Sequence, residues 1–185
     1  MSTEIFSYAV GVDPMRGGTH RMTSDIYFET HPYETFDVIF VDGLHEAQQV
    51  YRDVLNALRV LRPNGMILLH DCNPTNEESA STYRTSSVFA WNGDVWKALV
   101  ALRLRDDLDI ITIDTDHGIG VIRKGTPNTK LSEYWRTVLN PYPIPFLNYT
   151  HLEQHRTELL NLKTIREFKK WFHLSDSLAL EQYIY

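Results

Sequence analysis

Two runs in the first half of the chain are almost entirely apolar. Residues 36–41 (FDVIFV) and 66–69 (MILL) show no regular alternation of apolar and polar positions. Strands covered on both faces, as in parallel sheets, have this pattern. We therefore predict two strands buried on both faces, preceded by a shorter strand at residues 8–12 (YAVGV) that stops at Asp13 and Pro14.

A helix is predicted between these two buried strands. From residue 44 to residue 61 apolar side chains recur at helical spacing, among them Val54 and Leu58, with polar residues between them. The sequence Arg62-Pro63-Asn64-Gly65 ends this pattern, because proline does not continue a helix and Asn-Gly favours a turn. Strand, helix and strand in this order predict a right-handed βαβ unit.

The middle of the chain predicts a loop, a helix and a hairpin. Residues 77–92 are polar and weakly patterned, which indicates a long loop and a candidate lid on the acceptor side of a site. Asp94 is placed to cap a helix that carries Val95, Leu99 and Leu102. Residues 108–113 and 119–123 predict an antiparallel hairpin that turns at Asp116-His117-Gly118.

The pattern changes after residue 126, so we divide the chain into an α/β domain (residues 1–126) and a helical C-terminal extension (residues 127–185). Residues 130–139 predict a short helix, and residues 141–145 form a stiff proline-rich connector. Residues 151–172 read as one long amphipathic helix. Its wide apolar stripe must be covered by the domain itself or by a second subunit, which makes a homodimer plausible.

Charge and composition exclude several classes of function. The chain carries 18 Lys and Arg against 24 Asp and Glu, a net charge of −6, which argues against nucleic-acid binding. The single Cys72 excludes an internal disulfide. No apolar run approaches the roughly 20 residues of a membrane span, and the N-terminus has no signal-peptide pattern. We expect a soluble cytoplasmic protein without nucleic-acid or membrane partners.

Three acidic residues follow predicted strands. Asp13, Asp42 and Asp71 each come directly after, or one residue after, the end of a strand. In open parallel sheets ligands bind beyond the carboxyl ends of the strands, so we expect these carboxylates to converge on one pocket. Asp42 and Asp71, with the amide of Asn73, could hold Mg²⁺ or a similar hard cation. Alternatively, Asp42 caps the following helix.

Two further roles are assigned by residue type. Asp13 could accept hydrogen bonds from both hydroxyls of a ribose, or it could simply start a turn. His45 is the candidate general base for removing a proton from a hydroxyl, because the pKa of histidine lies near neutrality. His70 is the weaker candidate since it is still attached to a buried strand, and a histidine that only bonds the backbone is the alternative for both.

The runs YAVGVDP, FDVIFVDGLHEAQQVYRDVLNAL, RPNGMILLHDCNP and IITIDTDHGIGVIRKG resemble class I S-adenosylmethionine-dependent methyltransferases. They are most similar to a small bacterial group associated with sugar and polysaccharide modification. The resemblance covers residues 8–125 and implies a Rossmann-like α/β sheet, mostly parallel, with a C-terminal antiparallel hairpin. It also implies S-adenosylmethionine as cofactor and a sugar-like hydroxyl as methyl acceptor.

The resemblance also implies roles for single residues. Asp13 corresponds to the ribose-binding acid, and Ser24 and Asp25 correspond to the segment near the adenine, although Asp25 could equally cap a helix. Asp42 is placed among the cofactor-binding residues and, with Asp71, among the acids that hold a divalent metal in metal-dependent O-methyltransferases.

The N-terminus departs from this family. The segment MSTEIFS contains no glycine, so the family's first strand and its Gly-rich cofactor loop are missing from the expected position. That strand normally lies in the middle of the sheet, and its loss would leave unpaired backbone groups unless the sheet closes directly or another subunit fills the gap. The alternative to an enzyme is therefore a non-catalytic binding or dimerisation module, or a truncated relic, that no longer binds the cofactor.

Overall fold

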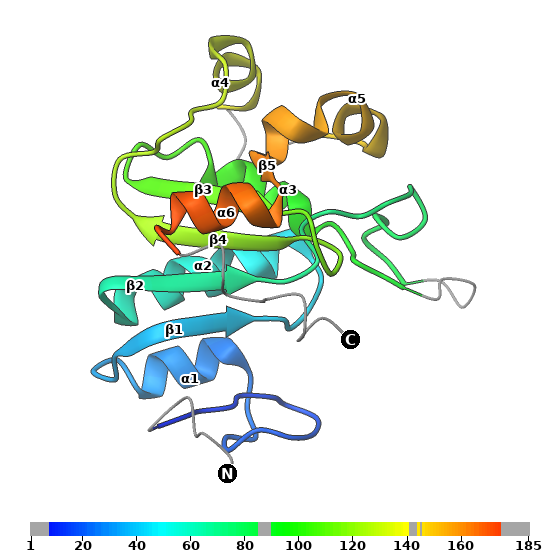
Figure 1. Cartoon of the computed structure of the whole chain (residues 1–185). Coiled ribbons are helices and arrows are strands. Elements are labelled where there is room, and N and C mark those ends of the chain that lie inside the picture. Colours follow the sequence, from blue (N-terminus) through cyan, green and yellow to red (C-terminus); the bar gives the residue numbers. More distant parts are fainter. Residues whose placement is uncertain (1–7, 85–89, 141–143, 145, 175–185) are drawn as a thin grey trace.

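The computed structural model describes residues 8–84, 90–140, 144 and 146–174. Within these residues the chain folds into one five-stranded sheet with helices on both faces (Figure 1). This confirms the predicted α/β, Rossmann-like class. None of the described helices has the length and apolar character that crossing a membrane requires.

The strands follow the order β1-β2-β4-β3-β5 across the sheet. Their bounds are β1 Phe36–Val41, β2 Leu61–Leu69, β3 Leu108–Ile113, β4 Ile119–Lys124 and β5 Leu162–Lys163. The helices are α1 Ser24–Thr30, α2 Ala47–Val60, α3 Val95–Leu102, α4 Glu133–Leu139, α5 Tyr149–Leu160 and α6 Ile165–Trp171.

The sheet is mixed. β1 and β2 run parallel and are joined through α2, as the sequence predicts, while β4 pairs antiparallel with both β2 and β3. The β3–β4 hairpin is also as predicted, and the short β5 adds a parallel strand beside β3. The Pro-Asn-Gly turn bulges out of β2, between the residue that pairs with Phe36 and the residue that pairs with Val38.

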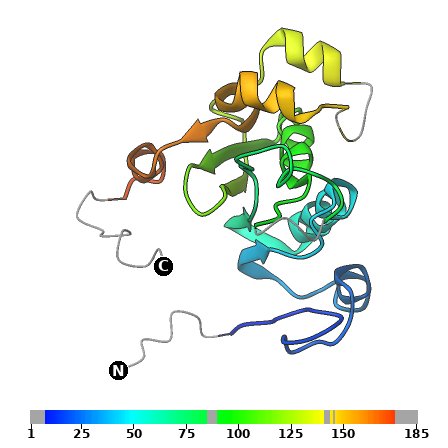
Figure 2. The same cartoon turned by 90° about the vertical axis from the view of Figure 1, so that its right-hand side faces the viewer.

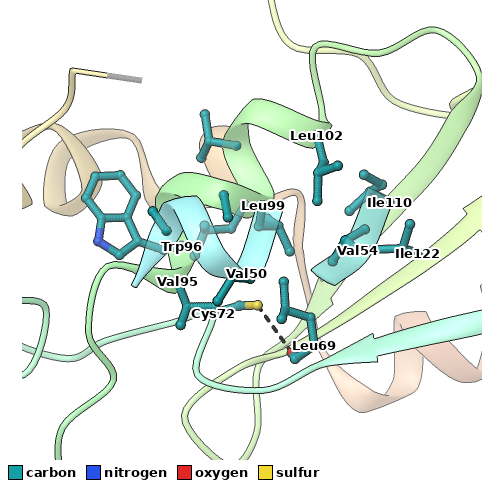
Figure 3. Packing of buried hydrophobic residues seen from close by; sticks show 14 of the residues in the cluster. Val50, Val54, Leu69, Cys72, Val95, Trp96, Leu99, Leu102, Ile110 and Ile122 are labelled. Carbon is teal, nitrogen blue, oxygen red and sulfur yellow. Dashed lines mark hydrogen bonds between the residues drawn. The ribbon is translucent and has the colours of Figure 1, made fainter. Parts of the chain in front are cut away.

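The main core lies between one face of the sheet and helices α2 and α3. Figure 3 shows its centre, where Cys72 lies fully buried and its Sγ donates to the carbonyl of Leu69 at 3.3 Å. The helical extension joins the same core, because Trp135 of α4 and Leu152 of α5 are buried in it. The extension therefore packs as part of the domain.

The opposite face of the sheet is covered only in part. Helix α6 packs on β3 and β4 through Ile165, Phe168 and Trp171. In Figures 1 and 2 no described element crosses β1 and β2 on that side. The prediction that β1 is buried on both faces is therefore wrong: Val38 is 37% exposed and Phe40 56%. β1 is an edge strand, and only its other face packs against the core.

The predicted strand at residues 8–12 does not form. This segment makes one isolated bridge, between Val12 and His20, and Asp13 N donates to the carbonyl of His20 at 3.1 Å. Among the described residues no strand pairs with the outer edge of β1, so this segment is not part of the sheet. It forms a local loop instead.

The predicted long helix over residues 151–172 is also wrong. α5 ends at Leu160, and the capping residue Asn161 adopts a left-handed conformation (φ 48°) that lets the chain pair with β3 as β5. A new helix then begins, because Thr164 and Glu167 form a reciprocal capping box at the start of α6. The predicted apolar stripe is thereby divided: its α5 part packs in the main core, and its α6 part packs on the opposite face of the sheet. The predicted proline-rich connector falls almost wholly outside the described residues.

Candidate functional site

Two strand ends bring acidic and histidine side chains together. Asp42 follows β1, and His70 and Asp71 follow β2, so the parallel pairing of these strands places the three residues side by side. His45 lies on the segment that leads from β1 into α2. The ligand atoms of Asp42, His45 and Asp71 all lie within 4.8 Å of one another. We call these three residues the strand-end cluster.

The distances within this region are short. His45 Nε2 lies 3.5 Å from Asp42 Oδ1, and His45 Nδ1 lies 3.3 Å from Asp71 Oδ2. His70 Nδ1 lies 3.3 Å from the same two carboxylate oxygens, while its Nε2 lies 3.4 Å from Asp116. The region thus alternates carboxylates and imidazoles, an arrangement that can accept and release protons.

Asp42 and His45, which face each other, shift each other's pKa. The hydrogen bond with His45 holds the pKa of Asp42 below its ordinary value, and desolvation opposes this shift. The bond with Asp42 in turn raises the pKa of His45 above its ordinary value, again against desolvation. The pair therefore favours a carboxylate beside an imidazolium.

The backbone around Asp71 is held in a strained conformation. Asp71 has φ 61°, which is uncommon for a residue with a side chain. The next two amides are bonded to the β3–β4 turn: Cys72 N donates to Gly118 O at 2.9 Å and Asn73 N to His117 O at 2.7 Å. A Cβ on Gly118 would lie 2.3 Å from Asn73 Cβ, so this contact requires glycine. The predicted hairpin turn thus supports the site.

The acid predicted to bind ribose is outside the cluster. Asp13 is not a member of the group, although the sequence predicts that all three strand-end acids converge. Its Oδ1 accepts from Met15 N at 2.7 Å and Arg16 N at 2.6 Å, which is the turn-forming role weighed as the alternative. These bonds lower the pKa of Asp13. Its second oxygen can still accept a hydroxyl, so the residue fits a ribose chemically.

The two residues predicted near the adenine bind helix α2. Ser24 donates to Asp53 at 2.6 Å, and Gln49 donates to Asp25 at 3.4 Å. Asp25 also lies 3.8 Å from Arg52. These contacts attach α1 to α2, and the roles of Ser24 and Asp25 toward a cofactor stay predictions.

Of the predicted magnesium ligands, Asp42 and Asp71 come together but Asn73 is not in the group. The amide oxygen of Asn73 accepts from Arg156 at 2.5 Å, and the Asn73 amide nitrogen donates to Asp114 at 3.0 Å. Both ends of the Asn73 side chain are thus engaged. The group that does come together offers an imidazole beside two carboxylates, a donor set that suits ions such as Zn²⁺ or Mn²⁺ better than Mg²⁺.

The sequence analysis did not identify Trp91 and Asn92, which contact the strand-end cluster. The loop before α3 brings Trp91 against His45, and Asn92 donates to Asp71 Oδ1 at 2.5 Å. The Asp94 side chain makes no capping hydrogen bond to its own helix; its Oδ1 instead accepts from Ala47 N at 2.7 Å and so caps α2. The Asn92-Gly93 pair could have indicated a tight turn at this position, because Asn-Gly pairs favour such turns.

Two other features are not part of the site. Burial raises the pKa of the Cys72 thiol well above its ordinary value, so it cannot act as a nucleophile. A shallow hollow lined by Asn64, Asp109 and Arg123 lies at the opposite strand ends. Its charges are paired within the hollow, because Arg123 lies 3.4 Å from Asp109.

Residues 11–72 match the family model of a methyltransferase domain. The matched segment includes all three members of the strand-end cluster. The comparison with curated proteins finds no match. Together with the α/β sheet, the family match supports the prediction from the sequence that the chain is a class I S-adenosylmethionine-dependent methyltransferase.

Proposed function

We propose that the protein transfers a methyl group from S-adenosylmethionine to a hydroxyl oxygen of a small, sugar-like acceptor. The observation that carries this proposal is the strand-end cluster, which unites a candidate base with two carboxylates inside the segment that matches the methyltransferase family. Such a cluster suits an acceptor that must lose a proton before or as it reacts.

His45 is the proposed base. Its Nε2 takes the proton of the acceptor hydroxyl, and the nearby Asp42 carboxylate stabilises the imidazolium that results. S-adenosylmethionine, when bound, supplies a methyl carbon attached to a positively charged sulfur. The acceptor oxygen forms the new C–O bond as the C–S bond breaks, so the products are a methyl ether, S-adenosylhomocysteine and a proton held by His45.

The remaining predicted residues belong to cofactor binding in this proposal. Asp13 would bind the ribose through its free carboxylate oxygen, and Ser24 and Asp25 would lie beside the adenine. Asp42 would serve both the cofactor and the base. No step of the proposed reaction passes through a metal ion, since the residues at the site do not fit the predicted Mg²⁺.

A methyl-transfer assay tests the proposal. The full chain is incubated with methyl-labelled S-adenosylmethionine and a panel of sugars and sugar nucleotides, with amines and thiols of similar size as competing acceptors. We expect label in an O-methyl ether, lowered at least about 100-fold by His45→Ala and unchanged by His31→Ala, which lies at the end of α1. Label only in amines or thiols, or equal loss in both variants, contradicts it.

A further inference from the structure

The loop before α3 contacts His45 at several points. This segment, Trp91–Asp94, lies at the end of the connection from β2 to α3, which extends past the strand ends in Figure 1. We call it the clamp segment. The candidate lid predicted from the sequence covers residues 77–92 and so includes only Trp91 and Asn92 of this segment. These two residues, with Asp94, are joined to the strand-end cluster or to the start of α2 by side-chain and backbone contacts.

Trp91 contacts the His45 ring in two ways. The two rings are stacked, with centroids 5.0 Å apart and planes 19° from parallel. The carbonyl of Trp91 also lies 3.0 Å from His45 Nδ1. A carbonyl only accepts hydrogen bonds, and Asp71 Oδ2, a second acceptor, lies 3.3 Å from the same nitrogen. In a neutral His45 these two acceptors favour the proton on Nδ1 over Nε2, which faces the Asp42 carboxylate at the longer distance of 3.5 Å.

The clamp segment is itself anchored. The indole Nε1 of Trp91 donates to the carbonyl of Ser81 at 2.8 Å, and Asp94 N donates to the carbonyl of His45 at 3.2 Å. Through Oδ1, Asp94 accepts from the first amide of α2, two residues after His45. His45 is therefore held through its ring and through the backbone that follows it.

Glycine makes this close approach feasible. Gly93 has φ 65°, and a Cβ at this position would lie 2.0 Å from the carbonyl oxygen of His45. No larger residue fits there without displacing the clamp segment. Its neighbour Asn92 is 1% exposed and orients the other carboxylate through its bond to Asp71 Oδ1.

We propose that the clamp segment, with Trp91 as its principal positioning residue, holds His45 in the Nδ1–H tautomer, so that the Nε2 lone pair, beside Asp42, accepts the proton. This inference rests on the proposed function in that His45 is the base. It assigns to the Trp91 carbonyl the role that a hydrogen-bond acceptor has beside other catalytic histidines, which is to fix the tautomer and orientation of the ring.

Nitrogen NMR of the histidine rings tests the proposal directly. In the full chain, treated with a chelator and held at a pH where His45 is neutral, the shifts of the two ring nitrogens report which one carries the proton. We expect the Nδ1–H form in the wild type and in Trp91→Phe, which keeps a stacked ring. Trp91→Ala keeps the main-chain carbonyl but removes the ring stack and the indole bond to Ser81 that hold this carbonyl at Nδ1. In this variant we therefore expect a mixture dominated by the Nε2–H form that free imidazole favours.

The outcomes separate this proposal from the proposed function. A wild-type His45 in the Nε2–H form overturns the proposal by itself, whether or not any variant folds, and so does an unchanged tautomer in a folded Trp91→Ala. Once an acceptor is known, Trp91→Ala should lower kcat at least about tenfold with little change in KM for the cofactor, and Trp91→Phe should restore it. A correct tautomer without any methyl transfer would contradict only the proposed function.

Discussion

His45 Nε2 lies 3.5 Å from Asp42 Oδ1, at the end of the strand that forms the edge of the sheet. The pair links the ionisation of the proposed base to the acid at the end of β1. Since the carboxylate raises the pKa of His45 above the ordinary 6.5, the base becomes neutral at a higher pH than a free histidine does.

Asp42→Asn should lower the pKa of His45, because the amide cannot stabilise the imidazolium. NMR titration of chelator-treated protein measures this. The pair also contributes to stability: the contribution of His45 is complete below its unfolded pKa and is lost as the pH rises through its raised folded pKa. An unchanged His45 titration in Asp42→Asn would show that the carboxylate does not act on the ring.

Metal selection is the second prediction. The strand-end cluster offers an imidazole nitrogen beside two carboxylates, so Mn²⁺ or Zn²⁺ should raise the melting temperature of the chain more than Mg²⁺ at equal concentration. Asp71→Asn should remove most of the effect. Equal stabilisation by Mg²⁺, or an effect that survives Asp71→Asn, would place ion binding elsewhere.

The third prediction concerns the attachment of the helical extension. Arg103 is 4% exposed and donates to the carbonyls of Glu158, Leu159 and Thr129, and burial lowers its pKa to about 10. Arg103→Met removes the donor to the Leu159 carbonyl and one of the two donors to the Glu158 carbonyl, which should cost about 2–4 kcal/mol of unfolding free energy.

Urea unfolding measures this loss, with Arg105→Met as the control. Arg105 pairs with Asp107 on the surface, so its replacement should cost no more than about 1 kcal/mol. Similar losses in the two variants would mean that Arg103 does not hold the extension to the core.

The homodimer expected from the sequence stays a prediction. The structure favours β1, and not the helical segment of residues 151–172, as its interface. The apolar face of β1 that carries Val38 and Phe40 is uncovered among the described residues, and the edge of that strand is free. A second copy pairing antiparallel about Ile39 would set Val38 opposite the other copy's Phe40, a favourable cross-strand pair.

Sedimentation equilibrium tests this arrangement. Val38→Lys should dissociate the dimer, whereas Tyr33→Lys, at a loop residue 94% exposed, should leave it intact. A monomeric wild type, or a dimer that both variants retain, would exclude β1 as the interface.

Periodicity predicted the central elements of the fold well. The apolar runs of β1 and β2 and the stripe of α2 each carry a strong local signal, and the parallel pairing of β1 with β2 follows from them. The sequence indicates the end of α5 only weakly, because the apolar spacing continues past Asn161 and only the backbone conformation of this residue ends the helix. Val38 and Phe40 are exposed because no described element covers that face of β1, which composition cannot reveal.

The site was predictable where it follows the strand ends. Asp42, His45 and Asp71 are close together because parallel strands end at one edge, a rule that needs only the sequence. Trp91 and Asn92 are joined to them by tertiary contacts across a loop, which no spacing in the sequence records. Asp13 was misplaced because its position assumed a strand that does not form.

Calorimetric titration of S-adenosylmethionine into the full chain tests the central claim most directly. We predict a saturable heat of binding that Asp42→Ala weakens at least about tenfold and that Asp37→Ala leaves unchanged, since Asp37 is an exposed β1 residue paired with Arg62. No heat with S-adenosylmethionine or S-adenosylhomocysteine up to millimolar concentration, in protein shown to be folded, would contradict the account.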